Sequence, residues 1–212
     1  MAIPITSLAQ LDPHGTYSYA DYLTWKFTEW VELLRGKVVR RMSAPTDQHQ
    51  AISGDLYFLL KQHLYRQTCQ VRYAPYDVRL RPLGADPAAA DAAVPTVVQP
   101  DLCVICDPTK IDRRGCLGPP DLVIEITSPG TAARDWKDKF DLYEESGVGE
   151  YWIVEPGEQL IVAFVRDVAT GRYQAVGEYA EPGPVPCATL PALGLDWADV
   201  FAVPPADAGR QL

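Results

Sequence analysis

Hydrophobic and polar positions along the chain form short apolar runs and helical repeats, which together predict strands and helices. Runs rich in β-branched and aliphatic residues predict strands at 30–33, 37–42, 69–73, 76–81, 100–106, 121–127, 150–155, 160–166 and 173–179. Apolar residues at helical spacing predict helices at 16–27, 45–66 and 132–146, and a short closing helix at 197–201. We therefore expect mixed α and β elements, a fold of the α/β (α+β) class.

Length and composition indicate one globular domain over residues 1–212. With 212 residues, 47% of them hydrophobic, the chain can bury a sizeable core. The stretch 82–96 is rich in Pro, Ala and Asp and is expected to be a flexible surface loop, and 202–212 a frayed tail. Since there is neither an apolar run of about 18 residues nor a basic-then-apolar N-terminus, we expect no membrane span and a cytoplasmic location.

The five cysteines are odd in number and scattered, which argues against a disulfide framework, so we expect them to be reduced. Cys103 and Cys106 form a C-x-x-C pair within a predicted strand. Residues three apart on a strand point to opposite faces, so these two thiols are not expected to share a metal ion.

The net charge of −9 is unevenly distributed. Residues 1–140 carry 16 basic and 16 acidic side chains, whereas residues 141–212 carry 3 and 12. The acidity therefore belongs to the C-terminal third and does not exclude a nucleic-acid partner, although no basic block provides a strong electrostatic footprint.

Two carboxylates lie within apolar strands, where an unpartnered charge costs several kcal/mol to bury. Asp101 opens the strand at 100–106, and Glu125 lies near the end of the strand at 121–127. Antiparallel pairing of these strands would place the two side by side, on a face of the second strand opposite to its aliphatic stripe. Like charges at close range repel unless a cation lies between them, and oxygen ligands favour a hard ion such as Mg²⁺.

Lys139 lies on the helix that follows the second of these strands. Trp136, Phe140 and Tyr143 are predicted to form the core stripe of that helix, and Asp135, Lys139 and Tyr143 form an overlapping i, i+4, i+8 row. An ammonium at the edge of the buried face could reach the carboxylate pair. The alternative is a surface ion pair between Lys139 and Asp135.

Several motifs occur in the order found in a known family. They are Val98-Gln99-Pro100-Asp101, the run from Pro120 to Pro129, then Asp135, Lys139 and Tyr143, and finally the run from Gly147 to Val154. Over residues 17–200 the chain resembles the Uma-two family, a bacterial group of restriction-endonuclease-like proteins assigned to the PD-(D/E)XK nuclease superfamily. The resemblance implies a restriction-endonuclease-like core, with a mixed β-sheet flanked by helices.

The resemblance also implies a divalent-metal site. Asp101, Glu125 and the carbonyl of Ile126 would hold Mg²⁺ or Mn²⁺. Thr127 occupies the position where the superfamily commonly has a lysine, and Lys139 fits the case in which that lysine has moved to the following helix. Glu32 would be either a third acid near the metal or an exposed strand residue. His49 would either approach the phosphate or an attacking water, or serve a structural role.

The function implied is metal-dependent hydrolysis of phosphodiester bonds in nucleic acid, with DNA as the expected substrate and a homodimer as the expected assembly. One alternative is a catalytically inactive binding or assembly module on the same fold, which the missing lysine and the acidic C-terminal third favour. Another is a glycoside hydrolase that uses the two carboxylates as acid and base, although no aromatic sugar platform is evident near the pair.

Overall fold

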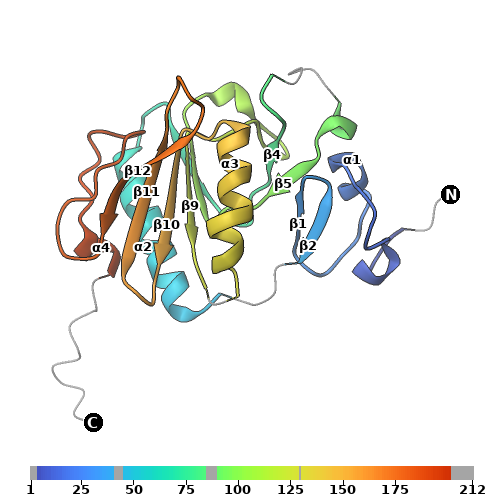
Figure 1. The fold of residues 1–212 in the computed structure, drawn as a ribbon, viewed down its shortest axis with the longest axis horizontal. Coiled ribbons are helices and arrows are strands. Elements are labelled where there is room, and N and C mark those ends of the chain that lie inside the picture. Colours follow the sequence, from blue (N-terminus) through green and yellow to red (C-terminus); the bar gives the residue numbers. More distant parts are fainter. Residues whose placement is uncertain (1–3, 41–44, 85–89, 129, 202–212) are drawn as a thin grey trace, which may run out of the picture.

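The computed structural model describes residues 4–40, 45–84, 90–128 and 130–201. The predicted tail at 202–212, the end of the predicted strand at 37–42 and part of the predicted loop at 82–96 lie outside these residues. Most of the described chain is arranged in two six-stranded sheets with helices packed on them (Figure 1). The predicted mixture of α and β elements is confirmed.

The larger sheet is mixed and has the strand order β12-β11-β10-β9-β6-β3. Its strands are β3 (Gln70–Tyr73), β6 (Leu102–Ile105), β9 (Leu122–Ile126), β10 (Glu150–Glu155), β11 (Leu160–Arg166) and β12 (Tyr173–Tyr179). Among the described strands of this sheet, only β9 and β10 pair in parallel, and the helical segment 134–146 connects them. Both strands are near-continuous apolar runs because both of their faces are covered.

Two helices cover opposite faces of this sheet, as Figure 1 shows. On one face, α2 (Asp47–His63) packs Ile52, Leu56 and Leu60 against the aliphatic stripe of β9. On the other face, α3 (Phe140–Ser146) packs with β10. The closing helix α4 (Trp197–Phe201) joins the α2 side. The described helices include none with the length and hydrophobicity that crossing a bilayer requires.

The second sheet has the order β2-β1-β5-β4-β8-β7. Its strands are β1 (Val31–Leu34), β2 (Lys37–Arg40), β4 (Val78–Leu80), β5 (Thr96–Val98), β7 (Ile111–Asp112) and β8 (Gly115–Leu117). The predicted hairpin at Arg35 and Gly36 joins β1 to β2, with both turn residues at positive φ. This sheet brings β1 to the edge of the candidate site described below.

The predicted loop at 82–96 is wrong at its C-terminal end. Val94 is fully buried, and β5 begins at Thr96 and pairs with both β1 and β4. Three residues are enough for an inner strand because strands on both sides donate hydrogen bonds to their backbone groups and accept hydrogen bonds from them. The local composition of the chain does not reveal this pairing.

The predicted helix at 16–27 shrinks to one turn, α1 (Tyr19–Tyr22), capped by Ser18. The chain leaves the helix because its aromatic side chains pack in another way: Trp25 contacts Tyr17 edge-on and lies tilted against Phe27, and the group covers β1. Tertiary packing thus overrides a weak helical repeat.

The prediction of reduced cysteines is wrong for one pair, since Cys69 and Cys106 are joined by a disulfide. Antiparallel pairing of β3 with β6 sets Gln70 opposite Ile105, so the next residues outward also face each other. Cys103, Cys116 and Cys187 are free and buried. The pairing was hidden because 37 residues separate the two cysteines in sequence.

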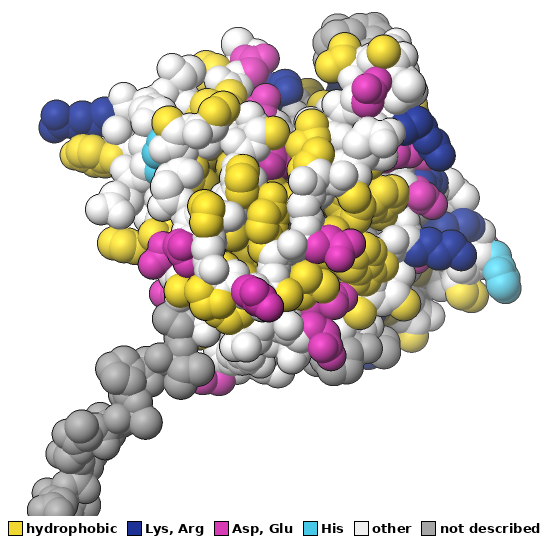
Figure 2. Space-filling model, turned by 60° about the vertical axis from the view of Figure 1, so that its left-hand side comes forward, with side chains coloured by type: hydrophobic (Ala, Val, Ile, Leu, Met, Phe, Trp, Pro, Cys, Tyr) yellow, Lys and Arg dark blue, Asp and Glu magenta, His cyan; other side chains and the backbone are white. Residues whose placement is uncertain are grey.

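Acidic side chains mark the side of the molecule formed by β12 and α4. Figure 2 shows Asp and Glu scattered around a central group of hydrophobic side chains, with Lys and Arg toward the margins of the view. This distribution agrees with the acidic excess of residues 141–212. A polyanion would therefore be repelled from this face.

Candidate functional site

A cleft of about 740 Å³ lies at the point where the two sheets and α2 meet. Four buried carboxylates line it, each at most 5% exposed: Glu32, Asp101, Glu125 and Asp135. Lys139, 3% exposed, lies among them. A dense group of buried charges in a cleft is typical of a functional site.

Asp101 and Glu125 are neighbours for the reason the sequence suggested. Strands β6 and β9 pair antiparallel with Leu102 opposite Ile124, which brings the residues on either side of that pair together. Glu125 also points to the face opposite the aliphatic stripe of β9, because its strand neighbours belong to the other core cluster. Both parts of that prediction are confirmed.

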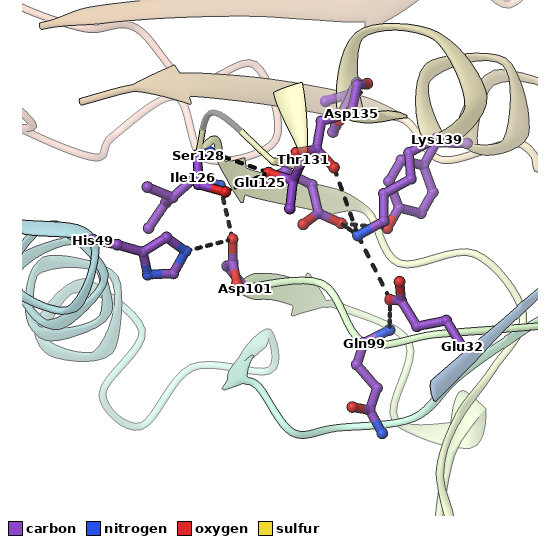
Figure 3. Close-up of polar contacts among 12 residues, drawn as sticks. Glu32, His49, Gln99, Asp101, Glu125, Ile126, Ser128, Thr131, Asp135 and Lys139 are labelled. Atoms are coloured by element: carbon purple, nitrogen blue, oxygen red, sulfur yellow. Dashed lines mark hydrogen bonds and ion pairs between the residues drawn. The ribbon is translucent and has the colours of Figure 1, made fainter. Parts of the chain in front are cut away.

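A backbone N–H and a histidine side chain help to fix the carboxylate of Asp101. Its Oδ2 accepts a hydrogen bond of 2.8 Å from the backbone N–H of Ile126 and lies 3.2 Å from His49 Nε2 (Figure 3). His49 reaches this point from the first turn of α2, where the hydroxyl of the N-cap residue Thr46 accepts a bond from the His49 N–H. The predicted residues His49 and Ile126 thus lie at the site.

Glu125 accepts two short hydrogen bonds on one oxygen. Lys139 Nζ and the Tyr143 hydroxyl each donate to Glu125 Oε1 at 2.7 Å. Burial raises the pKa of Glu125 to about 8, although the attraction of Lys139 opposes the shift. Burial, followed by the neighbouring Glu125, also raises the pKa of Tyr143 well above its ordinary value, so its hydroxyl stays a donor.

Lys139 lies between three carboxylates, as Figure 3 shows. Its Nζ is 2.7 Å from Glu125 Oε1, 3.6 Å from Glu32 Oε1 and 3.8 Å from Asp135 Oδ1. Burial lowers the pKa of Lys139, but the attraction of these carboxylates outweighs it and raises the pKa above its ordinary value. The ammonium is therefore charged at neutral pH. Its contact with Asp135 is buried, so the alternative of a surface ion pair is wrong.

Lys139 ends a π-helical segment, Arg134–Lys139. Wider π turns change which residues share a face, so Asp135 and Lys139 are each 3% exposed whereas Trp136 is 38% exposed. The predicted core stripe beginning at Trp136 is therefore wrong at its first position. The helix ends as predicted, with Gly147 left-handed at φ 87°.

Glu32 is not an exposed strand residue, because only 1% of its surface is accessible. Its Oε1 accepts a 2.7 Å hydrogen bond from the backbone N–H of Gln99, whose side chain donates to Asp77 at 2.8 Å. Sequence reasoning missed Gln99, which immediately precedes the Pro100-Asp101 pair. Its signal was a polar side chain next to a buried strand.

Lys139, and not Thr127, supplies the cation that contacts Glu125. Thr127 is buried and its backbone N–H donates to the Val154 carbonyl of β10, whereas the ammonium that contacts Glu125 comes from Lys139. The helical segment that follows β9, and not β9 itself, thus supplies the positive charge beside Glu125.

Among the residues that the structure describes, no three His, Cys, Asp or Glu side chains are grouped so as to hold a metal ion. A cation at Asp101 and Glu125 would need backbone, water or phosphate oxygens to complete its coordination. Mg²⁺ suits such a site, because it usually keeps several waters and takes one or two carboxylates. Among the described residues that line the cleft, Glu32, Asp101 and Asp135 outnumber the one buried ammonium even when Glu125 is protonated, so another cation would be attracted there.

Comparison with known proteins agrees with this architecture. A structure described as "a putative nuclease belonging to DUF820" from Anabaena variabilis matches with a TM-score of 0.66 and 18% identity, over 87% of this chain and 97% of that one. At this identity the match establishes the restriction-endonuclease-like fold. No curated protein matches the chain. The family model "Uma2: Putative restriction endonuclease" matches residues 19–198, and the chain therefore belongs to the Uma2 family.

Proposed function

We propose that this protein is a divalent-metal-dependent nuclease of the PD-(D/E)XK type that hydrolyses phosphodiester bonds in DNA. The observation that carries the proposal is the buried cluster in the cleft. Glu125 contacts Lys139 directly there, and Asp101 lies beside Glu125 in the sheet. The family and the fold match support a nuclease-like function in general terms.

Asp101, Glu125 and the carbonyl of Ile126 would hold the metal ion. When bound, Mg²⁺ or Mn²⁺ would polarise a phosphate oxygen and lower the pKa of water. The donor set fits, because it consists of oxygen atoms in a cleft with excess negative charge.

The side chains of the protein itself supply positioning and charge. Lys139, held charged by its three carboxylates, would offset the negative charge that develops on the phosphate. His49 fixes the orientation of Asp101 through the 3.2 Å contact and lies where it could meet an incoming phosphate. Arg40 and Arg134 also line the cleft and can bind phosphates of the substrate strand.

Cleavage assays test the proposal. Single-stranded and duplex DNA are incubated with Mg²⁺ or Mn²⁺ and the wild type, Asp101→Ala, Lys139→Ala, or the surface control Glu145→Gln. We expect both site variants to lose activity by about 10²-fold or more and the control to keep it. Equal activity in all four proteins would overturn the assignment.

The second candidate is a binding or assembly module without turnover. The ion pairs that already engage Lys139 and the acidic face near β12 favour it. Calorimetry separates the two functions. Binding of Mg²⁺ or Mn²⁺ that depends on Asp101 and Glu125 supports the nuclease, and its absence supports the inert module.

Homodimerisation and a cytoplasmic location stay predictions. Light scattering on the purified protein measures the first, with a mass of twice 23.4 kDa expected for the dimer.

A further inference from the structure

Two exposed aromatic side chains line the same cleft as the buried charges. Trp30 is 51% exposed and directly precedes β1, two residues before Glu32. Tyr73 is 56% exposed and ends β3. Large aromatic rings are usually buried, so two half-exposed rings in one charged cleft call for a ligand.

Tyr73 lines the cleft from the end of β3. Tyr57 of α2 contacts it edge-on, with ring centroids 4.7 Å apart. Tyr73 pairs with Leu102 in the sheet, and the N–H of the following Ala74 donates to the Asp101 carbonyl. The backbone at Tyr73 and Ala74 therefore lies beside that of Asp101 and Leu102 in the sheet.

Trp30 approaches the cleft from the other sheet. Its neighbour Val31 pairs with Arg40, and both Trp30 and Arg40 line the cleft. Arg134, from the π-helical segment, lines it as well. Aromatic faces beside guanidinium groups match a strand of alternating bases and phosphates.

The form of nucleic acid follows from what the rings can contact. In a duplex each base is stacked on its neighbours and paired, so a protein ring gains a base face only when the base is unpaired. The cleft volume of about 740 Å³ is of the size that encloses a small ligand. The carboxylates, each at most 5% exposed, are reached only by a group that enters it.

We infer that the cleft takes an unpaired segment of nucleic acid, with Trp30 and Tyr73 stacking on its bases and Arg40 and Arg134 binding its phosphates. This inference rests on the proposed nuclease function and specifies its substrate class. Trp30 and Tyr73 are substrate-contacting residues that determine the preference for single strands.

Binding under non-cleaving conditions tests the inference. With Ca²⁺ in place of Mg²⁺, fluorescence anisotropy gives the Kd of a labelled 15-nucleotide strand and of a hairpin duplex of the same sequence. Trp30→Ala and Tyr73→Ala are each expected to weaken strand binding by about 5- to 150-fold, the effect of losing one stacked base, and to leave duplex binding unchanged. Trp30→Phe keeps an aromatic face and should retain most of the affinity.

The matched control is Tyr65→Ala, which removes a ring that is 66% exposed but does not line the cleft. It should bind as the wild type does. The same anisotropy measurement with an RNA strand of the same sequence distinguishes DNA from RNA as the source of the unpaired bases. Tighter binding to duplex than to single strand, or unchanged binding by both cleft variants, would overturn the inference.

The outcomes also separate this inference from the proposed function. Metal-dependent cleavage that is lost in Asp101→Ala but unaffected by Trp30→Ala and Tyr73→Ala retains the nuclease and refutes the stacking role. Ring-dependent binding of the strand without any cleavage retains the stacking role and refutes the nuclease.

Discussion

Replacing Lys139 by methionine removes the cation at the centre of the buried cluster while keeping an unbranched side chain of similar length. At an effective dielectric constant of about 20, the Nζ distances of 2.7, 3.6 and 3.8 Å correspond to attractions of about 6 kcal/mol for Glu125 and about 4 to 5 kcal/mol each for Glu32 and Asp135. Desolvation of the buried ammonium offsets several kcal/mol of this attraction. Burial raises the pKa of Glu125 to about 8, so this carboxyl is mostly protonated at pH 7 and most of its attraction for Lys139 is not realised, which limits the loss further.

We therefore expect Lys139→Met to lower the free energy of unfolding by about 3 to 5 kcal/mol, the usual cost of breaking a buried pair. Urea denaturation at pH 7 without divalent ions, followed by tryptophan fluorescence, measures it. The double variant Lys139→Met, Glu125→Gln should lose less than the single one, because an amide at position 125 cannot ionise in a cluster that has lost its cation. Glu145→Gln, which removes a half-exposed partner of Arg35, is the control and should cost at most about 1 kcal/mol. A loss below about 1 kcal/mol for Lys139→Met would refute the picture of a buried cation holding the cluster together.

Two further substitutions test the surroundings of the cluster. Tyr143→Phe removes the hydroxyl that donates to Glu125 at 2.7 Å and should cost about 1.5 to 3 kcal/mol in urea denaturation at pH 9, because Glu125, with a pKa of about 8, accepts there as a carboxylate. Tyr151→Phe, whose hydroxyl donates to a backbone carbonyl, should cost about 1 kcal/mol, and a reversed order would contradict this reasoning. Gly115→Ala forces a Cβ to 2.1 Å from the Asp77 carbonyl oxygen at φ 122°, so the melting temperature should fall; an unchanged value would show that β8 is not constrained as described.

The strands that carry the site could be predicted because their signals are local. Apolar runs bounded by turn residues located β6, β9 and β10, and antiparallel pairing then made Asp101 and Glu125 neighbours. The contact of Lys139 with Glu125 followed from helical spacing in the next element. These features depend on residues within one strand or one helix and its neighbours.

The features that could not be predicted depend on contacts between distant segments. The π-helical segment that buries Asp135 and exposes Trp136 shifts the helical phase, and no propensity in the sequence specifies it. Strand β5 forms because β1 and β4 flank it, and the Cys69–Cys106 bond because β3 and β6 pair. The partners of β5 and of Cys69 lie in other segments of the chain, so tertiary context decides the local structure.

Binding of Mn²⁺ shows whether Asp101 and Glu125 form a divalent-metal site. Electron paramagnetic resonance counts the bound ions per chain in the wild type, in Glu125→Gln and in the control Glu145→Gln. We expect a site that is present in the wild type and the control and lost in Glu125→Gln. No bound Mn²⁺ in the wild type, or equal binding in all three proteins, would contradict it.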